Sequence, residues 1–326
     1  MNISVTGASG HIGANLIRIL IERKHKVTVL YNIDDRAFKE LDVNIVQGSL
    51  YNTYALEKLV LNADVVFHLA ANISILGDKD GSVCRTNVEG TKNIVNASIK
   101  AGVKKFIHFS SIHAFNQNPL NEPLDENRSL VGNNASSYDK SKAEGERIVL
   151  NSIEKGLDAI ILSPTSIIGP FDFKPSLMGQ VLIKMYNNQI HALVSGGYDW
   201  VDVRDVALSA YNSITMGVKG EKYLLSGKWA SLKELSLAIS KCTNKKTPKF
   251  VCPSWLAKAW LPILNLYDKA KGNAPLYTSE SLEILALGNR SICNNKAKNV
   301  LKHNPRSLEE TLIDTYKWFI ENKYLN

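Results

Sequence analysis

A tyrosine, a lysine and a pair of serines carry the clearest chemical signal in this sequence. Tyr138 and Lys142 lie in the segment Tyr-Asp-Lys-Ser-Lys, and Ser110-Ser111 ends an apolar run. A free tyrosine has a pKa of about 10, so a neighbouring ammonium must lower that pKa before the phenol can act as a base near neutrality. A shift of about three units needs roughly 4 kcal/mol, which is plausible for close charges in a dry site. A serine hydroxyl could orient the substrate oxygen, so the set suits hydride and proton transfer at a carbonyl.

These side chains act together only if the fold brings them to one place. Tyr138 and Lys142 are four residues apart and share a face if they lie on a helix. The serine pair ends the run 105–110, which we expect to be a strand of a parallel sheet, and ligands of such sheets bind at the carboxyl ends of the strands. Each pattern is common by chance. Together they become significant because they follow a glycine-rich turn at the start of the chain.

That turn contains three glycines spaced three apart. The β-branched run 3–6 leads into Gly7, Gly10 and Gly13, and an apolar stretch over 14–20 follows directly. This order predicts a buried strand, a tight turn and a helix. Glycine lets the backbone reverse and approach a ligand closely, and the free N–H groups of the helix start favour a phosphate. The turn therefore predicts a dinucleotide site.

The first half of the chain alternates strands with helices. We expect strands at 26–31, 43–48, 63–71 and 105–110, a helix near 56–61 and another that begins at Asn87. This alternation predicts an α/β fold with a doubly wound parallel sheet. We assign residues 1–165 to the dinucleotide-binding domain, rejoined by about 195–226. Residues 166–194 and 227–326 should form a smaller, mostly helical substrate-binding lobe.

The residue after the second strand bears on the choice of cofactor. An acidic residue there would bind the ribose 2′-hydroxyl of NAD, and an arginine would pair with the 2′-phosphate of NADP. The position holds Asn32, followed closely by Asp34, Arg36 and Lys39. The two cations could reach a 2′-phosphate and Asp34 could repel it. We expect NADP slightly ahead of NAD, and the choice stays open.

Composition excludes several classes of function. The net charge is +8, but the lysines are scattered without interleaved aromatic residues, so we expect no nucleic-acid partner. The four cysteines form no C-x-x-C pair and lack histidines at ligand spacing, which predicts reduced thiols and no metal. A core strand at the N-terminus leaves no room for a signal peptide, and no apolar run reaches the roughly 20 residues of a membrane span. We expect a cytoplasmic protein with no membrane partner.

The motifs resemble the extended short-chain dehydrogenases/reductases, the NAD-dependent epimerase/dehydratase superfamily, over nearly the whole chain. The matching segments are 6–13, 68–71, 86–91, 110–111, 138–142, 164–170 and 201–207. The segment 110–114 and the tail from Pro305 to Phe319 are most similar to the aldehyde reductase and flavonoid reductase (dihydroflavonol 4-reductase-like) group. The resemblance implies a Rossmann fold and NAD(P)-dependent reduction of an aldehyde or ketone to an alcohol. Some related enzymes are homodimers, so a homodimer is compatible with it.

The resemblance also assigns roles to individual residues. Ser111 would bind the substrate oxygen, Tyr138 would be the general acid in reduction, and Lys142 would lower the pKa of Tyr138. The residues that it implies for cofactor binding are Gly7, Ser9, Gly10, His11, Ile12, Gly13, Asn32, Arg36, Ser49, Leu50, Leu69, Ala70, Ala71, Asn87, Tyr138, Lys142, Pro164 and Ser166.

Other functions were weighed against the reductase. Sugar-nucleotide dehydratases of the superfamily place an Asp-Glu pair after the catalytic serine or threonine, where this chain has Ile112 and His113, which disfavours a dehydratase. A sugar-nucleotide epimerase with tightly bound NAD shares the Ser, Tyr and Lys and remains the alternative. A redox-sensing protein that binds the dinucleotide without turnover would have no reason to keep the three residues together.

Several residues have both a functional and a structural interpretation. His113 could touch substrate or be structural, and His11 could approach a phosphate or face solvent. Arg204 and Asp205 suggest a structural hinge between the domains. The segment 255–266 should be a lobe helix or lid. The lobe aromatics could line an apolar substrate site or form the lobe's own core: Trp229, Trp255, Trp260, Tyr267 and Tyr277.

Overall fold

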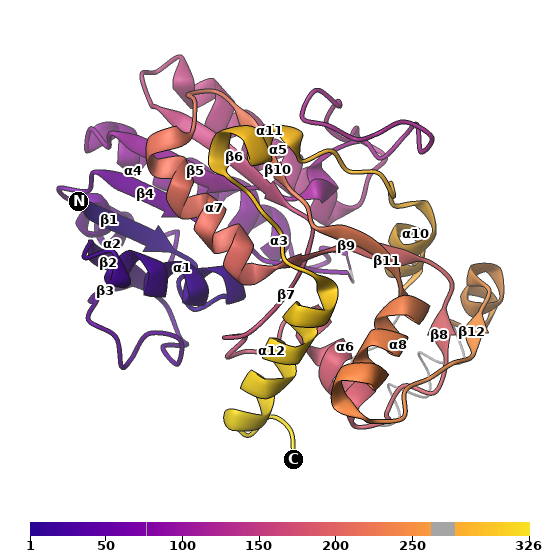
Figure 1. The fold of residues 1–326 in the computed structure, drawn as a ribbon. Coiled ribbons are helices and arrows are strands. Elements are labelled where there is room, and N and C mark those ends of the chain that lie inside the picture. Colours follow the sequence, from indigo (N-terminus) through magenta and orange to yellow (C-terminus); the bar gives the residue numbers. More distant parts are fainter. Residues whose placement is uncertain (76, 262–277) are drawn as a thin grey trace.

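The computed structural model describes residues 1–75, 77–261 and 278–326, and a seven-stranded sheet lies at its centre (Figure 1). The strand order is β10-β6-β5-β4-β1-β2-β3, and every pairing between these neighbours is parallel. The doubly wound parallel sheet expected from the sequence is confirmed. The strands are β1 (Asn2–Thr6), β2 (Lys26–Tyr31), β3 (Asn44–Gln47), β4 (Val65–His68), β5 (Lys105–Phe109), β6 (Ala159–Pro164) and β10 (Lys222–Leu225).

Helices cover both faces of this sheet (Figure 1). Successive residues of a strand point to opposite faces of the sheet and pack into two different cores. In β5, Ile107 and Phe109 pack on one face and Phe106 packs on the other. Strands buried on both faces are apolar almost throughout, which is why they stood out in the sequence. One layer contains α1 (His11–Glu22), α7 (Val203–Met216) and α11 (Asn295–Leu301), and the other contains α2 (Thr53–Val60), α4 (Gly90–Lys100) and α5 (Ser137–Ile153).

A second apolar core lies outside the large sheet, where Trp200, Trp318 and Phe319 are buried together. Two small sheets flank it, with strand orders β11-β9-β7 and β12-β8. The elements of this region are β7 (Ser166–Ile168), α6 (Leu177–Tyr186), β8 (Leu193–Val194), β9 (Gly197–Asp202), β11 (Lys228–Ser231), α8 (Leu232–Thr243), β12 (Val251–Cys252), α10 (Ser279–Leu287) and α12 (Leu308–Glu321). Most of these elements fall within the residues that we assigned to the substrate-binding lobe, but β9 lies in the stretch 195–226 that we assigned to the dinucleotide-binding domain.

The division of the chain remains a proposal, and one segment departs from it. We expected the whole of 227–326 in the lobe, but Ala297 and Leu301 of α11 are buried in the core of the large sheet. The backbone is helical over 254–261, as expected for the segment that starts at Trp255, and the rest of that segment lies outside the described residues. No helix in the described part of the chain has the length and apolar character that a bilayer crossing requires.

The helix expected to begin at Asn87 begins earlier. α3 (Ser82–Cys84) leads into η1 (Arg85–Glu89), a π-helical turn, which continues into α4. The carboxylate of Asp78 accepts hydrogen bonds from the N–H groups of Val83 and Cys84 at 2.8 and 2.9 Å. This carboxylate satisfies donors that would otherwise be unpaired at a helix start, so the helical segment extends five residues further back.

The expected lobe core of aromatic residues is wrong for two of the tryptophans. Trp255 and Trp260 are 70% and 52% exposed. Trp229 lies elsewhere, in the wall of a cavity described below. Tyr267 and Tyr277 fall outside the described residues. The buried aromatics of this core are Trp200 of β9 and, from the C-terminal helix, Tyr316, Trp318 and Phe319.

Arg204 and Asp205 form ion pairs that tie α7 to the C-terminal segment. Arg204 binds both oxygens of Asp202 and donates to Asp314 on α12 at 2.6 Å. Asp205 pairs with Arg306 at 2.9 Å. Asp202 and Asp205 are buried, so these pairs hold elements in place and serve the structural role that we expected.

Candidate active site

The glycine turn lies between the ends of β1 and β4. Gly7 has φ of +74°, and a Cβ there would lie 2.5 Å from the Ala70 nitrogen. A Cβ on Gly13 would lie 2.2 Å from the Gly7 carbonyl oxygen. Only glycine allows both approaches. Gly10 precedes α1 and has no side-chain capping bond, so the first N–H groups of the helix face outward for an anion. This cradle fits the diphosphate of a dinucleotide.

The His11 side chain is partly buried and lies against the segment that follows β7. Its Nε2 lies 3.1 Å from the carbonyl oxygens of both Gly169 and Pro170, and Asn15 Nδ2 donates to Pro170 at 3.0 Å. One turn further along α1, the Arg18 guanidinium lies 4.5 Å from the ring centroid of Phe171. The His11 side chain therefore joins α1 to the segment after β7, while its backbone remains in the cradle.

The end of β2 leaves the choice of cofactor unresolved. Asn32 is exposed. Arg36 grips Asp34 through two contacts, Nε to Oδ1 at 2.9 Å and Nη2 to Oδ2 at 2.7 Å. Exposed ion pairs of this kind contribute about 0–1 kcal/mol, so a 2′-phosphate could replace Asp34 as the partner of Arg36 at little cost.

Four other residues assigned to the cofactor lie near the glycine turn or the neighbouring strand end. Leu69 N donates to the Thr6 carbonyl at 3.1 Å and Ala70 N donates to the Thr6 hydroxyl at 3.3 Å, so these two residues and Ala71 run directly beside the turn. Leu50 is buried at the end of the β3 segment, where its side chain faces Gly90.

The three catalytic candidates come from β5 and α5. Ser111 follows β5 and caps the short 3₁₀ turn η2 (Ile112–Ala114), accepting from the His113 N–H at 3.2 Å. Tyr138 lies in the first turn of α5, and the nearby Ser111 side chain acts to lower the pKa of its phenol. Lys142, one turn later, is buried and donates to the Phe109 carbonyl at 2.7 Å. The structure thus brings the hydroxyl, the phenol and the ammonium to the carboxyl end of β5.

Burial dominates the acidities of this group. Burial raises the pKa of Tyr138 to about 12, against a smaller lowering by the Ser111 hydrogen bond. Burial lowers the pKa of Lys142 to about 8, partly opposed by the charge of Glu146. We expected the ammonium, together with the positive charge of a nicotinamide, to lower the Tyr138 pKa towards 7. The ammonium is directed at the Phe109 carbonyl and burial dominates the pKa of Tyr138, so the lowering by both charges together stays a prediction.

Asn87 connects the strand end to the catalytic helix. Its Nδ2 donates to the Asn72 carbonyl at 3.0 Å and to the Ser141 hydroxyl at 2.9 Å, and its Oδ1 accepts from Asn72 N at 2.8 Å. Asn87 lies in the π-helical turn η1, a feature often found at functional sites. Its amide is fully engaged within the protein and positions both the loop after β4 and the start of α5.

Two buried histidines lie beneath the site. His68 ends β4, its two ring nitrogens lie 2.8 Å from the Thr6 hydroxyl and 2.9 Å from the Thr91 hydroxyl, and its ring stacks on His108 with centroids 5.4 Å apart. Burial, reinforced by the charge of Lys142, lowers the pKa of His68 to about 3. Burial likewise lowers the pKa of His108. Both rings are neutral structural groups at ordinary pH.

A cavity of about 380 Å³ opens beside the catalytic group. Its walls include Ile112 and His113, which follow Ser111, and Ser136 and Asp139, which flank Tyr138. Ser166, the first residue of β7, also lines it, and Pro164 ends β6 two residues earlier; the resemblance assigns both to the cofactor. The cavity is large enough for a small organic substrate next to the phenol.

His113 is held beside Tyr138 by a carboxylate. Its Nδ1 lies 3.3 Å from Asp139 Oδ1, and its ring is 5.9 Å from the ring of Tyr138 at an interplanar angle of 66°. The side chain therefore lines the cavity next to the phenol, as its functional interpretation requires.

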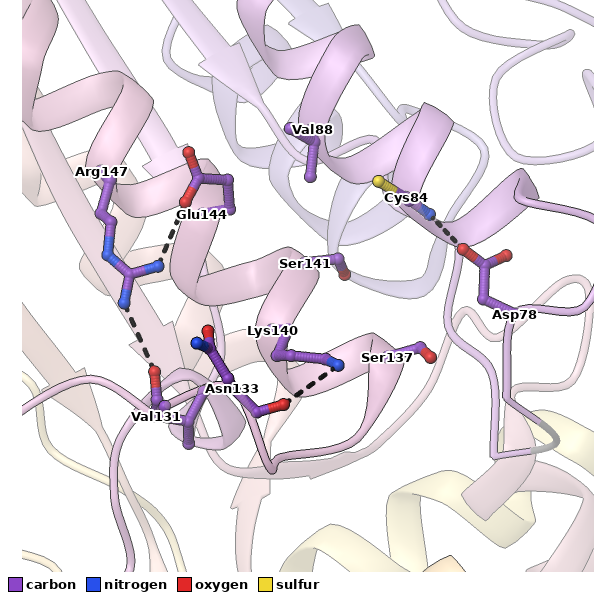
Figure 2. Close-up of a pocket in the computed structure, with 11 residues that line it drawn as sticks. Asp78, Cys84, Val88, Val131, Asn133, Ser137, Lys140, Ser141, Glu144 and Arg147 are labelled. Carbon is purple, nitrogen blue, oxygen red and sulfur yellow. Dashed lines mark hydrogen bonds and ion pairs between the residues drawn. The ribbon is translucent and has the colours of Figure 1, made fainter.

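A second cavity, of about 510 Å³, lies on a neighbouring face of α5 (Figure 2). Three of its charged groups have partners within the protein. Arg147 pairs with Glu144 at 3.1 Å, and Lys140 donates to the Asn133 backbone carbonyl at 3.3 Å. Cys84 also lines it, and the structure has this cysteine as a free thiol. Neither Ser111 nor the turn that follows it lines this cavity, so we do not assign the chemistry to it.

Thr165 and Asp199 are among the residues of this cavity that sequence reasoning missed, whereas Trp229, one of the aromatics expected to line a substrate site or the lobe core, does line it. Asp199 and Trp229 are opposite each other in the β9–β11 pair. Their separation along the chain is large, and no motif links them. Only the pairing of the strands could have revealed them. In the described residues, no group of three or more His, Cys, Asp or Glu side chains could hold a metal ion.

The fold and this site define a Rossmann-fold protein of the extended short-chain dehydrogenase/reductase type. Residues 3–225 match the NAD dependent epimerase/dehydratase family, and the chain belongs to that family. The resemblance seen in the sequence is thereby confirmed.

Relatives and solved structures match over the full length. A putative dihydroflavonol 4-reductase of Synechocystis is 30% identical over 332 residues, covering 98% of this chain and 95% of that protein. Sterol demethylase protein B of Methylococcus capsulatus is 27% identical over 325 residues, covering 98% and 99%. The crystal structure of gox2253 superposes with a TM-score of 0.85 at 29% identity, covering 100% of this chain and 99% of that one.

Proposed function

We propose that the protein reduces an aldehyde or ketone to an alcohol with a reduced nicotinamide dinucleotide, NADPH or NADH. The observation that carries the proposal is that Ser111, Tyr138 and the buried Lys142 come together at the carboxyl end of β5, beside a cavity lined by the residues that follow Ser111 and flank Tyr138. The family's dependence on NAD and the glycine cradle support a dinucleotide as the partner.

In this proposal each side chain has one role. The bound dinucleotide supplies a hydride to the carbonyl carbon. Ser111 donates a hydrogen bond to the carbonyl oxygen, and Tyr138 delivers its proton to that oxygen as the negative charge develops. Lys142 stabilises the phenolate left behind, which then regains a proton from solvent. Carbonyl, hydride and proton together give the alcohol.

The pKa of Tyr138 supports reduction as the direction near neutral pH. With a pKa of about 12 the phenol keeps its proton and is ready to donate it. Alcohol oxidation needs the phenolate, and forming it at pH 7 costs about 7 kcal/mol before any ligand charge contributes. The direction of reduction therefore needs no prior change of protonation.

A parallel screen tests the proposal. Carbonyl compounds are incubated with NADPH and with NADH, and the absorbance of the reduced nicotinamide is followed. We expect the reduced cofactor to be consumed in proportion to the carbonyl substrate. The cofactor that is consumed faster is the one that the protein prefers. Tyr138→Phe should lower turnover by about 10²–10⁴-fold while cofactor binding persists.

Tyr54→Phe is the matched control, because Tyr54 is 76% exposed on α2 and should not affect turnover. Unchanged turnover in Tyr138→Phe would contradict the proposal. Conversion of a sugar nucleotide without net consumption of cofactor would assign the site to an epimerase instead.

A further inference from the structure

The cavity beside Tyr138 has an acidic wall. Three carboxylates line it, those of Asp139, Asp199 and Glu283, and none of its lining residues in the described part of the chain is lysine or arginine. Two of the carboxylates have basic partners: Asp139 faces His113 at 3.3 Å, and Glu283 pairs with Lys258 at 3.0 Å. Asp199 has no ion pair with any described residue. The uncompensated charge of this wall therefore lies at Asp199.

Asp199 is held rigidly but incompletely satisfied. Its Oδ1 accepts hydrogen bonds from the Thr165 hydroxyl and from Gly227 N, both at 2.7 Å. Oδ2 accepts none from the described residues. Asp199 is only 8% exposed. Its Oδ2 nevertheless keeps some accessible surface, because it is not one of the completely buried polar atoms without a hydrogen-bond partner. Because Asp199 lines the cavity, that surface is the substrate's side.

The surrounding strands explain why the carboxylate stays there. Gly227 packs so tightly that a Cβ would lie 1.9 Å from the Trp200 carbonyl oxygen, which keeps its N–H on Asp199. Burial raises the pKa of Asp199 to about 6, so above that pH the group is charged. A poorly hydrated carboxylate with an open oxygen favours a ligand that donates hydrogen bonds and disfavours an anion.

Besides Lys258, which pairs with Glu283, Arg290 is a cation close to this wall. The Arg290 guanidinium is 4.8 Å from the ring centroid of Trp229, which faces Asp199 across the strand pair, and Arg290 itself is exposed. Arg290 contacts the ring of Trp229 but does not itself line the cavity. Binding of a nucleoside diphosphate would bring two phosphates to this cavity, with Asp199 opposing them.

We propose that Asp199 is a substrate-binding residue, and that the cavity accepts uncharged or cationic carbonyl compounds with a hydroxyl or ammonium donor in preference to anionic ones. This rests on the proposed reductase function and adds the substrate class. The Asp199 carboxylate accepts the donor through Oδ2 while the carbonyl end lies at Tyr138.

Two aldehydes of the same shape test the charge preference. 4-(Hydroxymethyl)benzaldehyde carries a hydroxyl donor where 4-formylbenzoate carries a carboxylate. With the cofactor saturating, we expect the wild-type kcat/KM to favour the hydroxymethyl compound by about tenfold or more, equivalent to about 1.4 kcal/mol. Asp199→Asn keeps an oxygen for Thr165 and Gly227 but removes the charge. It should reduce the preference to within about threefold, through KM rather than kcat.

Glu57→Gln is the matched control, an acid-to-amide change on α2 where Glu57 pairs with Lys100 at the surface. It should leave both rates unchanged. An unaltered preference in Asp199→Asn, or a wild-type preference for 4-formylbenzoate, would overturn the assignment. A thermal melt of Asp199→Asn confirms that it is folded before the rates are compared.

Calorimetry separates this assignment from the proposed function. If no aldehyde is reduced, the reductase proposal fails, and binding of the two corresponding benzyl alcohols to the dinucleotide-saturated protein decides the role of Asp199. The role of Asp199 is supported if the wild type binds the uncharged alcohol more tightly than the anionic one and Asp199→Asn loses this difference. Equal binding of the two alcohols by the wild type refutes it. UDP-glucose is the third probe: a wild-type Kd below about 0.1 mM would overturn the exclusion of anions.

Discussion

Replacing Lys142 by methionine should weaken catalysis while leaving the protein as stable at neutral pH, or more stable. Burial lowers the pKa of Lys142 from 10.5 to about 8, so keeping the charged form costs about 3.4 kcal/mol. Methionine removes that cost and keeps most of the volume. It also leaves the Phe109 carbonyl without the donor at 2.7 Å, a loss of about 1–3 kcal/mol. The net change at pH 7 is about 0 to +2 kcal/mol in favour of the variant.

The pH dependence of this difference has a definite sign. Between pH 8 and 10.5 the unfolded chain binds a proton at Lys142 that the folded protein has lost. The free energy of unfolding of the wild type therefore rises with pH through this window, by up to about 3 kcal/mol from this group. Methionine cannot titrate. The variant should be the more stable protein at pH 7 and the less stable by about 1–3 kcal/mol near pH 10.5.

Urea unfolding of both proteins at pH 7 and near pH 10.5 measures this crossover, and nicotinamide absorbance measures turnover, which should fall by about 10²-fold or more. Lys140→Met is the matched control on the same helix, because Lys140 is exposed and should give no pH-dependent difference. A Lys142→Met protein that is more than about 1 kcal/mol less stable at pH 7 would refute the reasoning. So would a stability difference that does not change with pH.

Two further predictions concern the cradle and the buried histidines. Gly13→Ala puts a methyl group 2.2 Å from the Gly7 oxygen, so α1 must shift; we expect about 1–3 kcal/mol lower stability and at least about tenfold weaker dinucleotide binding by calorimetry. Gly132→Ala, where a Cβ meets nothing within 4 Å, should change neither, and normal binding by Gly13→Ala would contradict the assigned cradle. Burial holds the pKa of His68 near 3, so the unfolded chain gains a proton below pH 6.5 that the folded protein refuses. Stability should fall on acidification from pH 6.5 to 5 by about 2 kcal/mol from this group, and His68→Gln should flatten that slope in urea titrations; an equal slope would disprove the neutral buried ring.

The sequence predicted best the features that repeat locally. β2 spans the expected residues 26–31, because a β-branched run bounded by polar residues has few other conformations. The glycine spacing and the Tyr138–Lys142 pair are equally local, and the structure brings both to the same edge of the sheet. By contrast, the π-helical turn at Asn87 depends on Asp78 reaching back to a helix start, which no periodicity reveals.

Features that depend on burial or on distant strand pairing could not be predicted. The rise in the pKa of Tyr138 caused by burial was not foreseen, because the sequence shows a nearby ammonium but not how far the phenol is removed from water. Asp199 meets Thr165 and Gly227 only after β9 has paired with β7 and β11. The exposure of Trp255 and Trp260 is of the same kind, since an aromatic side chain in a helix does not itself say which way it faces.

The contact of His11 with the Gly169 and Pro170 carbonyls links the glycine cradle to the segment that leads from β7 towards the lobe. Arg18 lies against Phe171, and Phe171 lies 6.0 Å from Trp318, so the linkage runs from the phosphate cradle into the lobe's aromatic core. A substitution in the lobe core that displaces Phe171 should therefore also move the start of α1, and with it the glycine cradle.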